Sequence, residues 1–213
     1  MEIVSNEVMR YLGYHGAEPD RRVSALVKEL TAVFSAGVTP KSVYGIWDCK
    51  VDSLSVAFDG MTVNSENLAR RLEGCCRIAL LAATLGPEAD TLIRRFSVQD
   101  MEKAVIAQAV CTVMIEAYCD RTGDEIAQRP DLGGLYSTKR FSPGYGDFDM
   151  AWQKDIVNLL NCDRRIGLTL TSGYMLAPSK SVTAVIGYSE EKKHSGGKCG
   201  CCDGTRCEFR ENE

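Results

Sequence analysis

The chain has 213 residues, 45% of them hydrophobic and 25% charged, which is the composition of an ordinary globular domain with enough length to bury a core. The formal net charge of -4, with Lys and Arg spread along the chain, excludes the electrostatic footprint of a nucleic-acid-binding protein. No apolar run reaches the roughly 18 residues of a membrane span, and the N-terminus lacks the pattern of a secretory signal. We therefore expect a cytoplasmic protein without a membrane partner.

The ten cysteines fall into two groups. The first group is scattered through apolar segments, where free cysteine behaves as a small hydrophobic residue: Cys49, Cys75, Cys76, Cys111, Cys119 and Cys162. The second group of four lies within nine residues near the C-terminus. The first group needs no functional explanation, whereas the second is a candidate for metal ligation.

In chain order, Ser5 and Asn6 predict the cap of a short helix over residues 7–12. An amphipathic helix is expected from about Asp20, because apolar residues then recur at steps of three and four. Glycine and proline breakers predict that this helix ends before Pro40.

The next segments carry the signature of strands. Residues 42–51 and 53–58 are rich in β-branched and aromatic residues and alternate in polarity, which predicts an antiparallel hairpin. Ser65 predicts the cap of a helix that continues through Leu72. Residues 76–86 then form a continuous apolar run, which is typical of a strand buried on both faces.

Gly86 and Pro87 predict the start of another helix, and residues 100–127 predict the longest one. The long helix is nearly all apolar except for a stripe of polar residues four apart: Gln108, Thr112, Glu116 and Asp120. This stripe is interpreted either as the solvent-facing side of the helix or as a surface that faces a ligand.

Residues 129–150 are rich in turn-forming residues and predict an irregular loop. A helix over roughly 151–160 and short strands around 166–170 and 181–188 follow. Since hairpins and helices do not alternate regularly, the order favours an α+β fold with a mainly antiparallel twisted sheet, flanked by helices that include one long central helix. Composition shifts only near residue 190.

Within the loop, Arg140 is followed by Phe-Ser-Pro-Gly-Tyr-Gly. A guanidinium offers a planar fork to a carboxylate, and glycine lets the backbone approach a flat base. Tyr145 could stack on an adenine or face a sulfonium cation. Because Pro-Gly is also a common structural turn, these residues alone leave a structural and a ligand-binding interpretation open.

The motif Arg-x-x-Pro-Gly-Tyr at 140–145 resembles the signature of the S-adenosylmethionine-binding reactivation domain of cobalamin-dependent methionine synthase. Residues 166–182 are similar to that family's Gly-x-x-Leu-Thr stretch with the proline and Ser-Val strand that follow. Residues 81–95 and the long helix after them look like smaller homologues encoded as separate chains. The resemblance is best over 75–190. It predicts an activation-like domain over 1–190, followed by a Cys-rich tail over 191–213.

The resemblance implies a set of cofactor-binding residues. Arg140 would bind the methionyl carboxylate of S-adenosylmethionine, the backbone around Ser142 and Gly144 would meet the adenine, and Tyr145 would form a wall of the pocket. Glu116 is similar in placement to a family glutamate that helps to hold the ligand.

Two family features differ in this chain. The N-terminal ligand aspartate of the family, which lies in a Trp-containing motif, has no clear counterpart. The family's Tyr-Tyr pair after the last strand is replaced by the sequence Glu-Glu-Lys-Lys, so Tyr188 is the candidate to substitute for it.

The implied function is that of an accessory protein for reductive remethylation of a cobalamin-dependent methionine synthase or a related corrinoid protein. Cobalamin would reside on the partner, and an electron donor such as a flavodoxin or ferredoxin would be needed. Because cobalt is the nucleophile in this chemistry, no side-chain base is required. This agrees with the sequence, in which neither His15 nor His194 forms a recognisable catalytic dyad.

The tail contains a C-x-C-C-x4-C pattern, in which Cys199, Cys202 and Cys207 are candidate ligands for Zn or an iron-sulfur cluster. Free thiols in a reducing compartment are the equally simple interpretation. An alternative function follows: a metal-binding interaction or electron-transfer module on the same fold, without nucleotide binding. An independent small-molecule methyltransferase is less favoured, because no glycine-rich Rossmann loop is present.

Overall fold

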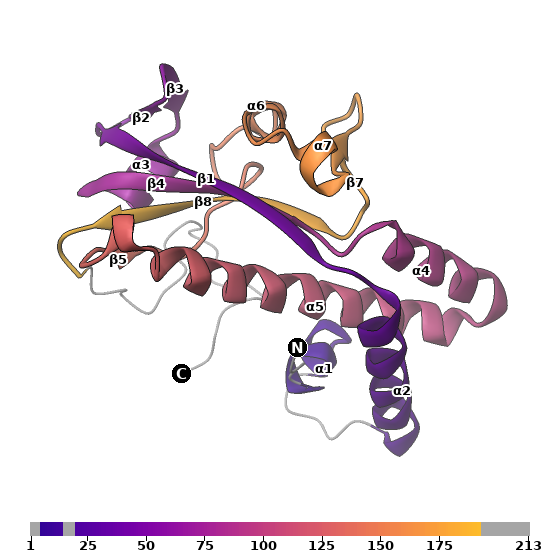
Figure 1. Cartoon of the computed structure of the whole chain (residues 1–213). Coiled ribbons are helices and arrows are strands. Elements are labelled where there is room, and N and C mark those ends of the chain that lie inside the picture. The colour runs from indigo at the N-terminus through magenta and orange to yellow at the C-terminus, as the bar shows by residue number, and fades with distance from the viewer. Residues whose placement is uncertain (1–4, 15–19, 193–213) are drawn as a thin grey trace.

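The computed structural model describes residues 5–14 and 20–192, with a six-stranded antiparallel sheet at its centre (Figure 1). In sheet order the strands are β3 (Met61–Asn64), β2 (Ser55–Phe58), β1 (Lys41–Val51), β4 (Cys75–Thr84), β8 (Ser181–Ser189) and β5 (Tyr136–Ser137). A second, two-stranded sheet pairs β6 (Thr169–Leu170) with β7 (Leu176–Ala177). The α+β class expected from the sequence is confirmed.

Helices cover both faces of the sheet, and Figure 1 shows α5 on the side opposite to α6 and α7. One face packs against the long α5 (Met101–Ala127), and α1 (Ser5–Tyr11), α2 (Arg21–Gly37) and α4 (Pro87–Gln99) pack on α5 in the same core. The other face packs against α3 (Glu66–Leu72), α6 (Trp152–Leu159) and α7 (Cys162–Ile166). A short 3-10 turn, η1 (Pro130–Leu132), follows α5.

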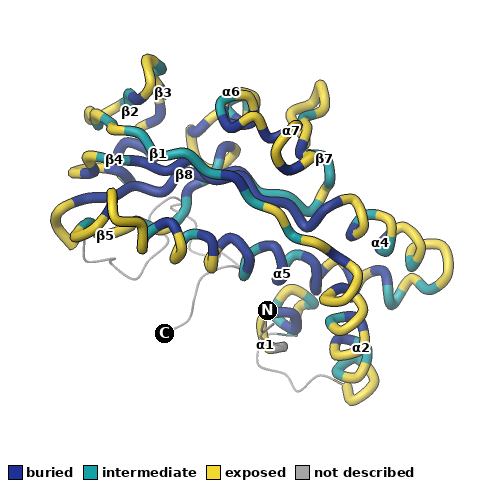
Figure 2. Tube along the Cα trace, viewed as in Figure 1, coloured by how far each residue is buried: buried dark blue, intermediate teal, exposed yellow. Residues whose placement is uncertain are grey.

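Strand β4 joins the two cores, because successive side chains of a strand point to opposite faces. Leu81 packs in the core against α5, whereas its neighbour Leu80 packs in the core on the α6 side. Both side chains are at most 1% exposed. The buried strand runs through the centre of the molecule in Figure 2. Burial on both faces explains why the sequence of this strand is a continuous apolar run.

Hydrogen bonds confirm the predicted starts of three helices, at Asp20, Ser65 and Asp100. Each of these side chains accepts a hydrogen bond from a backbone N–H in the first turn of the following helix. Such caps stabilise a helix by about 1 kcal/mol each, because they satisfy N–H groups that have no partner within the helix.

Two predictions needed correction. Residues 61–64 form the edge strand β3, which was not expected. Of the strand predicted around 166–170, only Thr169–Leu170 is extended, because Ile166 ends the single-turn helix α7. The polar stripe of α5 is exposed or half-buried, in agreement with either interpretation of it.

The six scattered cysteines are free thiols. Four of them are buried, Cys49 is half-buried and Cys76 is exposed. Within the described ranges, no helix is long and apolar enough to cross a membrane. Strand β8 ends at Ser189, so the last described element stops at the point where the composition of the chain changes.

Candidate functional site

The loop that carries the Arg-x-x-Pro-Gly-Tyr motif is anchored by two buried phenylalanines. Phe141 and Phe148 are 4% and 2% exposed, and their rings stack with centroids 6.0 Å apart. The backbone of Phe141 also forms an isolated bridge with Val185 of β8, with N–O distances of 2.9 and 2.8 Å. The loop is therefore held at both ends by the core and along one side by the sheet.

Asp147 provides a second anchor at the start of α3. Its carboxylate accepts hydrogen bonds from the Ser65 hydroxyl and from the backbone N–H groups of Glu66, at 2.7 Å, and Asn67, at 3.1 Å. Partial desolvation raises the pKa of Asp147, but these hydrogen bonds outweigh it and lower the pKa to about 2. The charged carboxylate of Asp147 thus caps the N-terminus of α3 and ties the loop to it.

Two glycines let the loop close. Gly144 has φ +94°, and a Cβ there would lie 2.8 Å from Met150 Cε. Gly146 has φ +58°, and a Cβ there would lie 2.9 Å from the amide of Asn67. A side chain at either position would be strained by the positive φ, and its Cβ would also require the Met150 or Asn67 side chain to move.

Arg140 points from this loop to the polar stripe of α5. Its Nη2 atom lies 2.9 Å from Glu116 Oε2 and 2.7 Å from Asp120 Oδ1, so one guanidinium nitrogen bridges two carboxylates. The Arg140 side chain is only 19% exposed, whereas those of Glu116 and Asp120 are 41% and 70% exposed. The structure thus brings Arg140 and Glu116 together as the sequence suggested and adds Asp120, which was not among the expected ligand residues.

The charge of this cluster is well defined. Burial lowers the pKa of the Arg140 guanidinium, but the nearby Cys119, Glu116 and Asp120 outweigh this effect and raise the pKa above its ordinary value. With one cation and two carboxylates, the cluster of Arg140, Glu116 and Asp120 carries a net charge of -1 near neutral pH.

Tyr145 and Tyr11 stand near this cluster on different elements. Tyr145 is 65% exposed at the tip of the loop, with its ring 6.5 Å from that of Phe141. Partial burial and then the proximity of Glu116 raise the pKa of Tyr11 at the end of α1, and Tyr145 contributes to the same effect. Helix α1 packs against α5 in the same core and brings Tyr11 within electrostatic reach of Glu116, which the sequence did not reveal.

Lys180 meets the same stripe of α5 further toward the helix N-terminus. Its ammonium group donates to the Gln108 carbonyl at 3.2 Å and to the Thr112 hydroxyl at 3.0 Å. Desolvation lowers the pKa of Lys180, although it stands near Cys111 and Asp90. Nothing in the sequence pattern pointed to this contact between the start of β8 and the middle of α5.

The remaining expected site residues differ in their exposure to solvent. Ser142 is half-buried and Gly144 is exposed, so both belong to the accessible surface of the loop. Tyr188, in contrast, is 0% exposed in the core on the α5 side, and its hydroxyl has no hydrogen-bond partner among the described residues. Burial raises its pKa, and the nearby Tyr44 adds to the effect. This burial argues against a ligand contact by Tyr188.

The tail ligands Cys199, Cys202 and Cys207 lie outside the described residues, as do His15 and His194. Within residues 5–14 and 20–192, no group of three or more His, Cys, Asp or Glu side chains could hold a metal ion. The metal hypothesis for the tail therefore stays a prediction.

Comparison with known proteins agrees with this fold. Residues 65–200 match the family described as the vitamin B12 dependent methionine synthase, activation domain. Because this match covers more than half of the chain, the protein belongs to that family. No curated protein matches.

The fold is similar to that of a solved structure described as the MetH reactivation domain bound to AdoHcy. The TM-score is 0.65 at 15% sequence identity, and the alignment covers 90% of this chain and 75% of that one. At this identity, the likeness establishes the fold.

Proposed function

We propose that this chain binds S-adenosylmethionine at Arg140 and the surface around it, and that it presents the ligand to a corrinoid-bearing partner protein. The observation that carries the proposal is the cluster of Arg140, Glu116 and Asp120 on the family's motif loop. The AdoHcy bound to the similar MetH domain supports the same ligand class.

The charges of the cluster fit the amino-acid end of the ligand. A methionyl group has one carboxylate and one ammonium, and S-adenosylmethionine adds a sulfonium, so the ligand has a net charge of +1. Arg140 would bind the carboxylate, while Glu116 and Asp120 would face the positive groups. A site with a net charge of -1 should therefore bind S-adenosylmethionine more tightly than the neutral S-adenosylhomocysteine.

The loop would position the rest of the ligand. The exposed backbone of Gly144 could meet a flat base on the side away from Met150, and exposed Tyr145 could cover the base or face the sulfonium. Because the loop is anchored by Phe141, Phe148 and Asp147, little ordering would accompany binding.

The role of the protein would be positioning. The bound ligand would supply an electrophilic methyl group to the reduced cobalt of the partner's corrinoid, with its sulfur keeping the bonding electron pair, after a donor such as a flavodoxin or ferredoxin has reduced the metal. The residues of this chain would hold the methyl group toward the metal and would transfer no proton. The partner would be a cobalamin-dependent methionine synthase or a related corrinoid protein.

The activation-like unit would comprise residues 1–190. Residues 191–213 would form a separate Cys-rich tail. The end of β8 at Ser189 supports this division. A Zn or iron-sulfur site in the tail would add a second function, which metal analysis of the full chain under anaerobic conditions tests.

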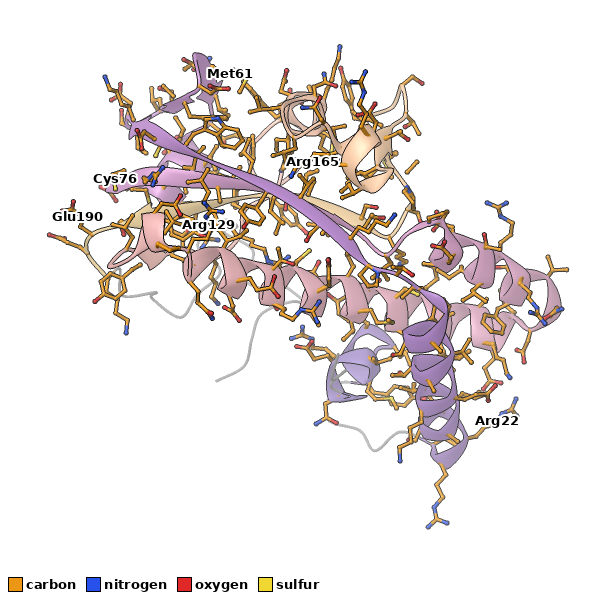
Figure 3. The ribbon with its side chains drawn as sticks, in the orientation of Figure 1. Arg22, Met61, Cys76, Arg129, Arg165 and Glu190 are labelled. Carbon is orange, nitrogen blue, oxygen red and sulfur yellow. The ribbon has the colours of Figure 1, made fainter. Side chains whose placement is uncertain are left out.

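Isothermal titration of S-adenosylmethionine and S-adenosylhomocysteine into the full chain tests the proposal. We expect saturable binding that Arg140→Ala weakens about 10- to 100-fold, because a charge-assisted hydrogen bond contributes about 1.5 to 3 kcal/mol. Arg140→Lys should give an intermediate loss, since it keeps the charge and loses the planar fork. The matched control is Arg22→Ala, which removes another arginine that is ion-paired to α5, through Glu102 (Figure 3). Equal affinity of Arg140→Ala and the control would overturn the assignment of the site.

A further inference from the structure

A second candidate binding site lies on the opposite side of the sheet from Arg140. A groove of about 730 Å³ runs between α6, the start of α7 and the β6–β7 hairpin. Figure 1 shows these elements on one side of the sheet and α5 on the other. No residue of the Arg140 cluster or of its loop lines this groove. It is therefore separate from the site of the proposed function.

The groove gathers polar side chains whose hydrogen-bonding groups are free. Six lining residues that carry side-chain donors make no side-chain hydrogen bond or ion pair with the part of the chain that the structure describes, and the same holds for the carboxylate of Asp163. The six are Lys154, Asn158, Asn161, Arg164, Ser172 and Tyr174. Their side chains offer cationic, amide and hydroxyl donors from three separate elements. The groove thus presents exposed donors from three elements that no protein group among the described residues uses.

The charge of the groove favours an anion. Lys154 and Arg164 contribute two positive charges, and Asp163 is the one carboxylate among its lining residues. Val157, which is 7% exposed, and half-buried Leu170 add an apolar surface. A volume of this size is within the usual range for small-molecule sites, and the mostly polar lining suits a polar ligand.

The hairpin presents an aromatic ring at this groove in a fixed and unusual conformation. Tyr174 has φ +59°, in the left-handed region that favours glycine. The turn is held by hydrogen bonds from the Tyr174 N–H to the Thr171 carbonyl and from the Thr171 N–H to the Met175 carbonyl, at 3.0 and 2.9 Å. Asn161, also a lining residue, has φ +51°. The ring of Tyr174, 39% exposed, can stack on a flat group.

From these features we propose that the groove binds a phosphate ester that carries a flat ring, of about the size of a mononucleotide. Arg164 and Lys154 bind the phosphate, since a guanidinium and an ammonium are strong donors to its oxygens. Asn158, Asn161 and Ser172 donate to the polar middle of the ligand, and Tyr174 stacks on the ring.

Titration calorimetry with AMP as the probe, and with inorganic phosphate and adenosine as partial probes, tests this proposal on the full chain. We expect saturable binding of AMP and weaker binding of each partial probe. Arg164→Gln should weaken AMP binding about 10- to 100-fold. The control is Arg165→Gln, a neighbouring exposed arginine of α7 that does not line the groove (Figure 3). Both residues are exposed, so both variants should fold, which circular dichroism checks.

The Arg140→Ala variant separates this site from the first one. AMP binding that survives in Arg140→Ala and is lost in Arg164→Gln supports the groove, whether or not S-adenosylmethionine binds elsewhere. AMP binding that is lost in Arg140→Ala and kept in Arg164→Gln assigns the probe to the first site and overturns the proposal. Absence of binding by AMP and phosphate, or equal loss in Arg164→Gln and Arg165→Gln, also overturns it.

Discussion

The Asp147 carboxylate joins the motif loop to α3, so Asp147→Asn tests whether this anchor stabilises the fold. In the native protein its pKa lies near 2, compared with an ordinary value of 3.8. A difference of that size corresponds to about 2 kcal/mol at neutral pH before solvent screening. Since Asp147 is exposed, solvent screens much of this contribution, and we expect the free energy of unfolding to fall by about 1 kcal/mol at pH 7.

The effect should depend on pH in a defined direction. Because the folded-state pKa is lowered, the stabilisation is complete well above pH 4 and is lost as the pH falls through 4 toward 2. Urea denaturation followed by circular dichroism at several pH values between 7 and 3 measures it. Asp155→Asn is the control, since that exposed aspartate makes no side-chain hydrogen bond within the described residues. A deficit in Asp147→Asn that is absent at pH 7, or equally large at pH 3, would refute this reasoning.

Three other substitutions give distinct readouts. Asp120→Asn should weaken S-adenosylmethionine binding by up to about fivefold and S-adenosylhomocysteine binding less, by calorimetry, because only the former carries the sulfonium charge; an equal loss for both contradicts the charge argument. Tyr174→Gly should raise the free energy of unfolding by about 1 kcal/mol in urea denaturation, because glycine adopts positive φ without strain; a decrease would show that contacts of the ring dominate. Leu81→Ala should lower the free energy of unfolding by about 2 to 5 kcal/mol in the same assay, because the Leu81 side chain is fully buried. Leu54→Ala is the control, since its side chain is 63% exposed, and it should change the free energy of unfolding by less than about 0.5 kcal/mol.

Elements with strong local signals were predictable from the sequence. Ser65 and Asp100 combine a side chain suited to capping with a following run of helix formers, and both act as caps. The signal is weaker where an element is short. Helix α7 is a single turn, and β3 is a four-residue edge strand, so neither spans enough residues to show a period.

The candidate site was predictable only as far as the motif reached. The Arg140 loop and Glu116 could be found from the sequence, but the second carboxylate, Asp120, depends on how the loop crosses α5. Tyr11 lies more than a hundred residues before Glu116 and Arg140 in the sequence, and its position follows from the packing of α1 against α5. For Tyr188, the alternation along β8 places the ring in the core, as it does for Ile186 two residues earlier.

The two phenylalanines that anchor the loop have a consequence for its motion. Opening the loop would expose the rings of both Phe141 and Phe148 to water, which makes local opening nearly as costly as unfolding of the core around them. The backbone N–H groups of Phe141 and Gly144 donate to Val185 and to Phe148 at 2.9 and 2.7 Å. These amides should therefore exchange with deuterium as slowly as those of the central strands, although the tip of the loop lies at the surface.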